Sequence, residues 1–242
     1  SFVIDYISHL IVHIVYLIRL FHLLWYNIRA QRRVGEMAGI RKAEISDADV
    51  VSSLILETGI RFLPLIFGPQ VKLILGRLIK TPGTVFYIDN VYVLEIDEGK
   101  VVGVMVAYPG YIIRKRSLKT ALVLFDMMGM ELIRRIRIFR LVESKNKVNK
   151  DEFYISNIAI DSKHRGMGYG TKLLKYAEEL AKEHGLSKLS LDVENTNSKA
   201  IEFYKRLGYR GTKVKRIYIR GNLFTFVRMQ KLLDNSQYNK QK

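Results

Sequence analysis

Three glycines at alternate positions, Gly166, Gly168 and Gly170, form the segment of the chain whose spacing points most directly to chemistry. They follow an apolar run typical of a buried strand and lead into a stretch with helical periodicity. Because glycine lacks a Cβ atom, backbone N–H groups in such a turn can approach a ligand closely. The amino end of a helix adds N–H donors and a partial positive charge. Together these features predict a cradle for a pyrophosphate group.

Two familiar phosphate-binding motifs do not fit this segment. A P-loop ends in Gly-Lys followed by Ser or Thr, whereas Gly170 is followed by Thr171 and then Lys172. A dinucleotide fingerprint needs the spacing GxGxxG and a second βαβ half, and the chain offers neither here. A tight strand-to-helix turn without any ligand is the plain alternative.

A second motif follows a predicted strand over residues 188–193. Asn197 is well suited to cap a helix that continues to Leu207 and stops at Gly208. Phe203 and Tyr204 lie one turn before the end of that helix. A phenol in reach of a leaving group can supply a proton, whereas the ordinary alternative for Tyr204 is packing with its hydroxyl at the surface.

The two motifs together resemble those of the GCN5-related N-acetyltransferase (GNAT) superfamily. The first matches its Arg/Gln-x-x-Gly-x-Gly/Ala signature and the second its C-terminal block. The likeness is firm over residues 153–209, extends to 40–229 in the order of elements, and includes nothing before Met37. The residues that carry it are Arg165, Gly168, Gly170, Asn197, Ala200, Phe203, Tyr204, Gly208 and Tyr209.

The resemblance implies that acetyl-CoA is the co-substrate and that no metal takes part. It implies that backbone groups of the fourth strand meet the pantetheine arm, that amides of the glycine loop hold the pyrophosphate, and that Tyr204 protonates the departing thiolate. The residues expected to bind coenzyme A are Ile158, Ala159, Ile160, Arg165, Gly166, Met167, Gly168, Tyr169, Gly170, Thr171 and Asn197.

The general base is less sharply defined by the sequence. An ammonium acceptor must lose a proton before it attacks a thioester. Asp192 occupies a strand position at which similar protein-alanine acetyltransferases carry a glutamate base. Glu152 and Glu194 are rivals, and a chain of water molecules is a further alternative.

The resemblance implies an N-acyltransferase that moves an acetyl group from acetyl-CoA directly to a primary amine. The acceptor can be a protein N-terminus, a lysine or a small amine. The alternative is a non-catalytic sensor or scaffold that binds acyl-CoA on the same fold. Specific nucleic-acid binding is not expected, because the sequence shows neither a recognition helix nor an aromatic platform.

Composition fits this interpretation without naming the acceptor. The 242 residues carry a formal net charge of +17, which favours anionic partners. They contain no cysteine, which excludes disulfides, a thiolate nucleophile and thiolate metal sites. The lack of disulfides fits a reducing compartment, so we expect a cytoplasmic protein, membrane-associated if residues 1–36 are retained.

Residues 1–36 allow three interpretations. The apolar run Phe2–Tyr26 with its basic flank fits a membrane or interfacial helix, although Arg19 within the run is costly in a bilayer. It also fits a packed helix, or an upstream extension that does not belong to the native domain. His9 and His13 have metal-ligand spacing but lack a third ligand nearby.

Periodicity along the chain predicts a mixed α/β fold with a central sheet flanked by helices. The resemblance implies that this is the acyl-CoA N-acyltransferase fold. The expected order is a strand, two helices, three strands with a helical insert, a helix, a strand, a helix and two strands. The first helix starts at residues 46–49 with Ser46 as its cap. We expect the domain to span residues 37–233 and residues 234–242 to form a disordered tail.

The insert, residues 111–150, departs from the family and lies between the third and fourth strands. It predicts a Met-rich helix with an arginine-rich end. It is suited to lining an acceptor pocket, acting as a lid, lying on an anionic membrane or pairing with a second subunit in a homodimer. Added core with a solvated basic face is the plain alternative. Its place in the chain predicts that it borders the acceptor side.

Overall fold

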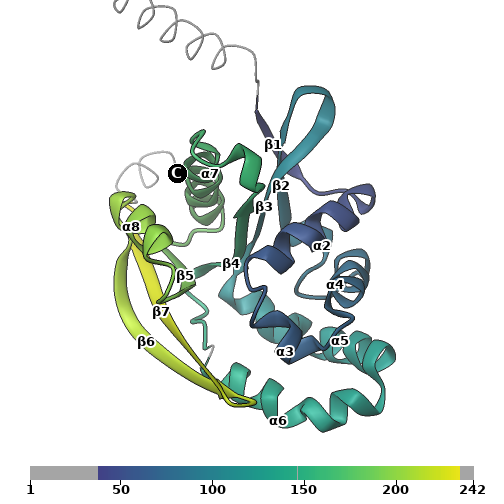
Figure 1. The fold of residues 1–242 in the computed structure, drawn as a ribbon. Coiled ribbons are helices and arrows are strands. Elements are labelled where there is room, and N and C mark those ends of the chain that lie inside the picture. Colours follow the sequence, from purple (N-terminus) through teal and green to yellow (C-terminus); the bar gives the residue numbers. More distant parts are fainter. Residues whose placement is uncertain (1–37, 146, 235–242) are drawn as a thin grey trace, which may run out of the picture.

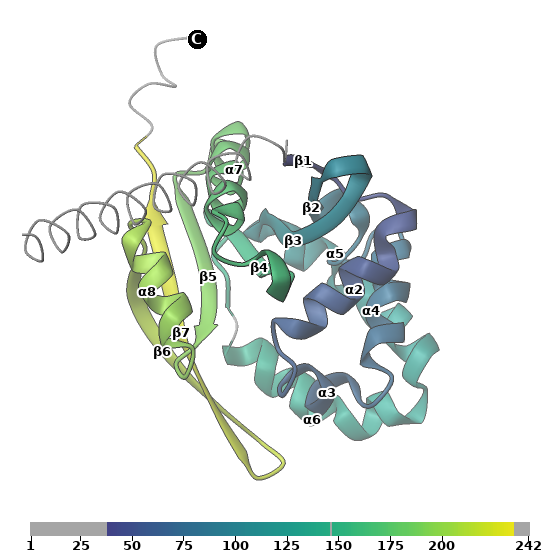
Figure 2. The same ribbon diagram turned by 45° about the horizontal axis from the view of Figure 1, so that its top comes forward.

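The computed structural model describes residues 38–145 and 147–234, which form a seven-stranded mixed sheet with helices on both faces (Figure 1 and Figure 2). The predicted α/β class is confirmed, and the order of elements differs in one place, because three helices rather than the predicted two lie between the first and second strands. The strands are β1 Gly39–Lys42, β2 Val91–Ile96, β3 Lys100–Pro109, β4 Phe153–Ile160, β5 Lys188–Glu194, β6 Arg210–Ile219 and β7 Asn222–Leu232. The helices are α2 Ala48–Glu57, α3 Leu63–Phe67, α4 Val71–Lys80, α5 Gly110–Met128, α6 Met130–Lys145, α7 Tyr169–Glu183 and α8 Ser198–Arg206.

The sheet has the strand order β1-β2-β3-β4-β5-β7-β6. Neighbouring strands are antiparallel except for β4 and β5, which are parallel and joined through α7. A parallel pair needs a crossover connection, and the helix that supplies it packs against the sheet. The glycine loop therefore lies between the end of β4 and the start of that crossover helix.

Alternation along the strands divides the core between the two faces of the sheet. In β2, Val91 and Val93 are buried against α2 and α4, whereas Tyr92 and Leu94 are buried in the cluster that α7 covers. Figure 1 shows α7 over one face of the sheet and α2 and α4 over the other. The helical periodicity expected after the glycine loop corresponds to α7, and the apolar positions on its inner face are buried: Leu173, Leu174, Ala177 and Leu180.

The start of the first helix differs from the prediction that Ser46 caps it. Glu44 is the N-cap of a short 3-10 turn, Ile45–Asp47, and its backbone N–H donates to the Asp47 carboxylate at 2.8 Å. That carboxylate also accepts from Arg41 at 2.7 Å. A carboxylate that accepts from both a backbone N–H and a guanidinium stabilises this turn better than an exposed serine hydroxyl, so the predicted role of Ser46 was wrong.

The insert is two helices, because α5 and α6 are separated at Gly129, where φ is +53°. Its periodic apolar positions do not all point inward. Val123 and Leu124 are buried against Ile74 and Leu78 of α4, in a satellite cluster of the core. Leu118 and Phe125 are 72% and 53% exposed, which leaves an apolar face on the outside of α5.

The predicted helix over residues 1–36, with His9 and His13, lies outside the described residues, as does the predicted tail beyond Asp234. Within the described ranges, no helix combines the length and the apolar character that a membrane crossing requires.

Candidate active site

The parallel pair at the centre of the sheet comes apart beside the glycine loop. β4 pairs with β5 at three positions, from Phe153 opposite Leu189 to Ile155 opposite Leu191, and pairing then stops. On its other edge β4 stays paired with β3 as far as Ile160, with a β-bulge just after Ile155. Bulges of this kind redirect a strand next to functional sites. The β5-facing edge of β4 beyond Ile155 therefore has no strand partner.

Ile158, Ala159 and Ile160, the predicted pantetheine contacts, lie on this edge of β4. The side chains of Ile158 and Ile160 pack against the core cluster on the α7 side, whereas Ala159 packs on the α2 side. An edge of β4 without a strand partner leaves backbone donors and acceptors for a ligand, since an amide chain can hydrogen-bond there as an added strand would.

The glycine loop adopts backbone conformations that favour glycine. Gly166 and Gly168 have φ of +81° and +85°, and a Cβ atom built at either position would meet nothing within 4 Å. Gly168 is the N-cap of α7, whose first turn closes with the N–H of Lys172 donating to the Gly168 carbonyl. The backbone N–H groups that precede this bond have no acceptor within the helix. The loop therefore presents free N–H donors at the amino end of α7, next to open space.

Gly170 has a different role. A Cβ atom at this position would lie 3.2 Å from Cζ of Phe203, so the glycine permits α7 and α8 to approach closely. Around it, Met167 is 55% exposed at the loop, Tyr169 is buried in the core, and Thr171 is half-buried.

Arg165 holds the loop in place through its side chain. Its Nε donates to the Ile160 carbonyl at 2.9 Å, and its Nη2 donates to the Glu57 carboxylate at 3.0 Å. The guanidinium thus ties the glycine loop to the end of β4 and to the last turn of α2. Charge-assisted bonds of this kind fix geometry more than they add stability when they are exposed.

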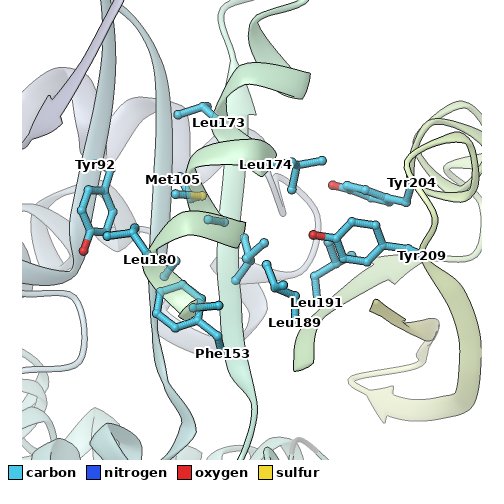
Figure 3. Packing of buried hydrophobic residues seen from close by; sticks show 14 of the residues in the cluster. Tyr92, Met105, Phe153, Leu173, Leu174, Leu180, Leu189, Leu191, Tyr204 and Tyr209 are labelled. Atoms are coloured by element: carbon cyan, nitrogen blue, oxygen red, sulfur yellow. The ribbon is translucent and has the colours of Figure 1, made fainter. Parts of the chain in front are cut away.

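Tyr204 extends from α8 into the core on the α7 side and is 8% exposed. Figure 3 shows Tyr204 and Tyr209 as neighbours with their hydroxyls directed towards α7, and their ring centroids are 5.9 Å apart. Burial raises the pKa of the Tyr204 hydroxyl to about 12, so it is protonated at neutral pH. A proton donor is therefore available on the face of the sheet that carries α7.

Asn197 is the N-cap of α8, as predicted: its Oδ1 accepts from the backbone N–H of Ala200 at 3.1 Å. The amide oxygen is therefore engaged within the helix cap. Its predicted contact with the cofactor arm stays a prediction.

Asp192, the predicted base, lies in a buried ionic network on the opposite face of β5. Its carboxylate accepts from Arg228 Nε at 2.8 Å, Lys215 Nζ at 2.6 Å and the Tyr154 hydroxyl at 3.0 Å. Burial raises the pKa of this carboxyl, but the bonds and charges of Arg228 and Lys215 outweigh it and leave the pKa below its ordinary value. A carboxylate with a lowered pKa is a weaker proton acceptor, so these contacts weaken the predicted role of Asp192 as base.

The two rival carboxylates differ from each other. Glu152 is fully buried and accepts from Ser190 at 2.7 Å, from Arg228 at 3.3 Å and from Gln230 at 2.9 Å, so it extends the same network. Glu194 ends β5 on the same face as Asp192, is half-buried, and has no side-chain hydrogen bond to any residue that the structure describes. Of the three carboxylates, Glu194 therefore makes the fewest side-chain contacts that hold the fold together.

Sequence patterns did not single out the side chains that lie between α2 and α3 and on β7, on the face of the sheet that carries Asp192. The Asn157 amide donates to the Thr58 hydroxyl at 2.7 Å, which joins the unpaired stretch of β4 to the end of α2. The Phe62 ring makes edge contacts with Phe224 and Phe226 at centroid distances of 5.1 and 5.0 Å. A signal existed for Arg228, because a charged residue on the inward side of an otherwise apolar strand needs a buried partner.

The family model described as Acetyltransferase (GNAT) family matches residues 76–209, more than half of the chain. The chain belongs to the acetyltransferase (GNAT) family. The GNAT match includes the glycine loop, both strands of the diverging pair and the tyrosine of α8, so the predicted resemblance is confirmed.

Among curated relatives, the GNAT chain is 36% identical over 69 residues to N-alpha-acetyltransferase 30 of Schizosaccharomyces pombe, covering 28% of this chain and 46% of that protein. It is 36% identical over 72 residues to a putative [ribosomal protein bS18]-alanine N-acetyltransferase of Bacillus subtilis, covering 30% of this chain and 48% of that protein. The matched stretch thus spans less than half the length of either relative.

Solved structures support the GNAT fold over a larger part of the chain. A structure titled "The crystal structure of acetyltransferase" matches with a TM-score of 0.57 and 24% identity, covering 81% of this chain and all of that one. Ard1 from Thermoplasma volcanium matches with a TM-score of 0.52 and 20% identity, covering 82% of this chain and 99% of that one. Likeness at this level of identity shows the fold.

Proposed function

We propose that this GNAT protein transfers an acetyl group from acetyl-CoA to a primary amine in a direct reaction. The observation that carries the proposal is the divergence of β4 from β5 after three residue pairs, next to the glycine loop at the amino end of α7. The unpaired edge of β4 would hold the pantetheine arm, and the amides from Gly166 to Thr171 would hold the pyrophosphate.

In this reaction the amine nitrogen attacks the thioester carbonyl carbon, the C–N bond forms and the C–S bond breaks. Negative charge develops on the carbonyl oxygen and then on sulfur. A backbone N–H of β4 near Ile158 would stabilise the first charge. The Tyr204 hydroxyl, which is protonated at neutral pH, would donate its proton to the thiolate and be reprotonated by water.

The proton released by the amine needs an acceptor on the face of the sheet opposite Tyr204. Among the three candidate carboxylates we favour Glu194, because Asp192 and Glu152 are engaged by Arg228 and by further donors. Glu194 is half-buried and lies opposite Phe226 of β7, beside the aromatic contact with Phe62. Unlike Asp192 and Glu152, Glu194 has no cationic partner among the residues that the structure describes.

The acceptor is a primary amine on a protein N-terminus, a lysine or a small molecule. Two relatives have names that point to protein acceptors, N-alpha-acetyltransferase 30 and the [ribosomal protein bS18]-alanine N-acetyltransferase, and these support a protein acceptor here. The relatives also include streptothricin and thialysine acetyltransferases, which support a small amine. A panel that contains both classes therefore belongs in the first assay.

The decisive experiment measures thiol release from acetyl-CoA across a panel of amines and peptides. Tyr204→Phe is compared with Tyr209→Phe, a matched control, since Tyr209 is also buried beside it and its hydroxyl has no hydrogen-bond partner in the described chain. We expect Tyr204→Phe to lower kcat by about 10²–10⁴-fold and Tyr209→Phe to leave it nearly unchanged. Equal turnover in both variants would remove Tyr204 from the mechanism, and acetyl-CoA binding without thiol release on any amine would favour a sensor.

A further inference from the structure

The outer face of the insert is apolar and basic at once. On α5, Leu118, Leu122 and Phe125 are 72%, 56% and 53% exposed, and their spacing of four and three residues places them on one side of the helix. On α6, Met130 and Ile133 are 65% and 50% exposed. We call this surface, formed by the exposed side chains of α5 and α6, the insert face.

The fold holds the insert face outward. Val123 and Leu124 bury the opposite side of α5 against α4. Arg116 fixes the same helix with two bonds of 2.7 Å to the Asp89 carboxylate. On α6, the buried Arg135 donates to the Leu65 carbonyl at 2.8 Å. Because both helices are anchored on their inner sides, the apolar residues of the insert face cannot turn into the core.

Basic side chains surround the apolar residues of the insert face. Helices α5 and α6 contain nine Lys and Arg against three Asp and Glu, a surplus of six positive charges. Arg116 and Arg135 are engaged in the hydrogen bonds described above, which anchor the two helices. Five other cations are exposed and have no carboxylate partner among the residues that the structure describes: Arg114, Lys115, Lys119, Arg137 and Arg140.

We propose that the insert face docks the protein on an anionic lipid bilayer. Exposed Leu, Phe, Met and Ile side chains flanked by Lys and Arg are the composition with which helices lie in a membrane interface. Neither α5 nor α6 is apolar and long enough to cross a bilayer, which fits helices that lie on the surface. The inference does not depend on the proposed enzymatic function.

Charge favours the bilayer over two other occupants. A second copy of the chain would bring two insert faces of the same positive sign together. Residues 1–36 contain four Arg and two acidic residues, so they also carry positive charge. A surface rich in anionic headgroups offers both the apolar layer and the opposite charge that the insert face needs. In Figure 1, α5 and α6 lie at the opposite end of the molecule from α7.

The test is co-sedimentation of the full chain with vesicles of phosphatidylcholine alone or with about 30% phosphatidylserine. We expect binding to the anionic vesicles and at least about ten-fold weaker binding of the double variant Leu122→Glu/Phe125→Glu. The matched control, Val214→Glu/Leu232→Glu, changes two residues that are 56% and 74% exposed on β6 and β7 and should bind like the wild type.

A second variant, Arg137→Glu/Arg140→Glu, tests the electrostatic part and should also weaken binding to anionic vesicles, with a loss that shrinks in high salt. Equal binding to both vesicle types, or no binding to either, would overturn the proposal. Wild-type binding by Leu122→Glu/Phe125→Glu would also overturn it, because membrane affinity would then lie elsewhere in the chain. If the wild type did not bind vesicles but formed a concentration-dependent dimer that Leu122→Glu/Phe125→Glu abolished, the occupant of the insert face would be a second copy of the chain.

Discussion

Replacing Asp192 by Asn separates a structural role of this carboxylate from a catalytic one. The side chains of Asp192, Arg228 and Lys215 are 10%, 5% and 3% exposed, so the network is shielded from water. Removing one charge leaves two buried cations with fewer partners, and breaking a buried ion pair in this way costs about 3–5 kcal/mol. Because Asn keeps one acceptor oxygen, we expect a loss at the lower end, about 3 kcal/mol, or roughly 6–12 °C in Tm.

The pH dependence of this loss follows from the pKa of Asp192. Its pKa in the folded protein lies below that of the unfolded chain, because the bonds and charges of Arg228 and Lys215 outweigh the opposing effect of burial. The stabilisation is therefore fully present above the unfolded pKa of about 4 and is lost as the pH falls through the lower, folded value. The difference between wild type and Asp192→Asn should be largest at neutral pH and should shrink below about pH 4.

Asp192→Asn and Glu194→Gln should be compared in two assays, urea unfolding for stability and thiol release for activity. We expect Asp192→Asn to lose stability, and Glu194→Gln to keep stability within about 0.5 kcal/mol while its kcat falls. If Asp192→Asn kept its stability but lost turnover, and Glu194→Gln were active, the assignment of Asp192 to the buried network would be refuted.

Three further substitutions test the local geometry. Asn197→Ala removes the side-chain cap of α8 and should cost about 1 kcal/mol in urea unfolding; a wild-type midpoint would show that the cap contributes nothing. Gly110→Ala places a methyl group onto the backbone of Asn149 where α5 leaves the sheet, and should cost about 2–3 kcal/mol in thermal unfolding, whereas Ala at Gly76, which meets nothing within 4 Å, should be tolerated. Phe62→Ala removes the aromatic contacts with Phe224 and Phe226 and should raise the KM for the amine more than the Kd for acetyl-CoA; an unchanged amine KM would place the acceptor elsewhere.

Local signals were sufficient to predict most elements of the fold. An apolar run identified β4, alternation identified β5, helical spacing identified α7, and Asn197 marked the start of α8. These features depend on residues that are close together in the chain. The glycine loop was predicted for the same reason, because strand, turn and helix follow one another directly.

Contacts between distant segments could not be predicted in this way. The partners of Asp192 come from β4, β6 and β7, and only the sheet order brings Tyr154, Lys215 and Arg228 to one carboxylate. The insert shows the other limit. Its periodicity predicted helix, but the direction of the apolar positions depends on where α4 and Arg135 anchor it, and a periodic pattern carries no information on that.

The most direct test of the account is acetyl-CoA binding by calorimetry to Gly168→Glu and its matched control Gly185→Glu. Both glycines have positive φ, +85° and +68°, and a Cβ atom at either position would meet nothing within 4 Å, so both substitutions strain the backbone similarly. Only Gly168 lies at the amino end of α7, where a carboxylate would repel the pyrophosphate. We predict that Gly168→Glu weakens binding at least about ten-fold while Gly185→Glu stays within about two-fold of wild type; equal affinity in the two variants would contradict the proposed cradle.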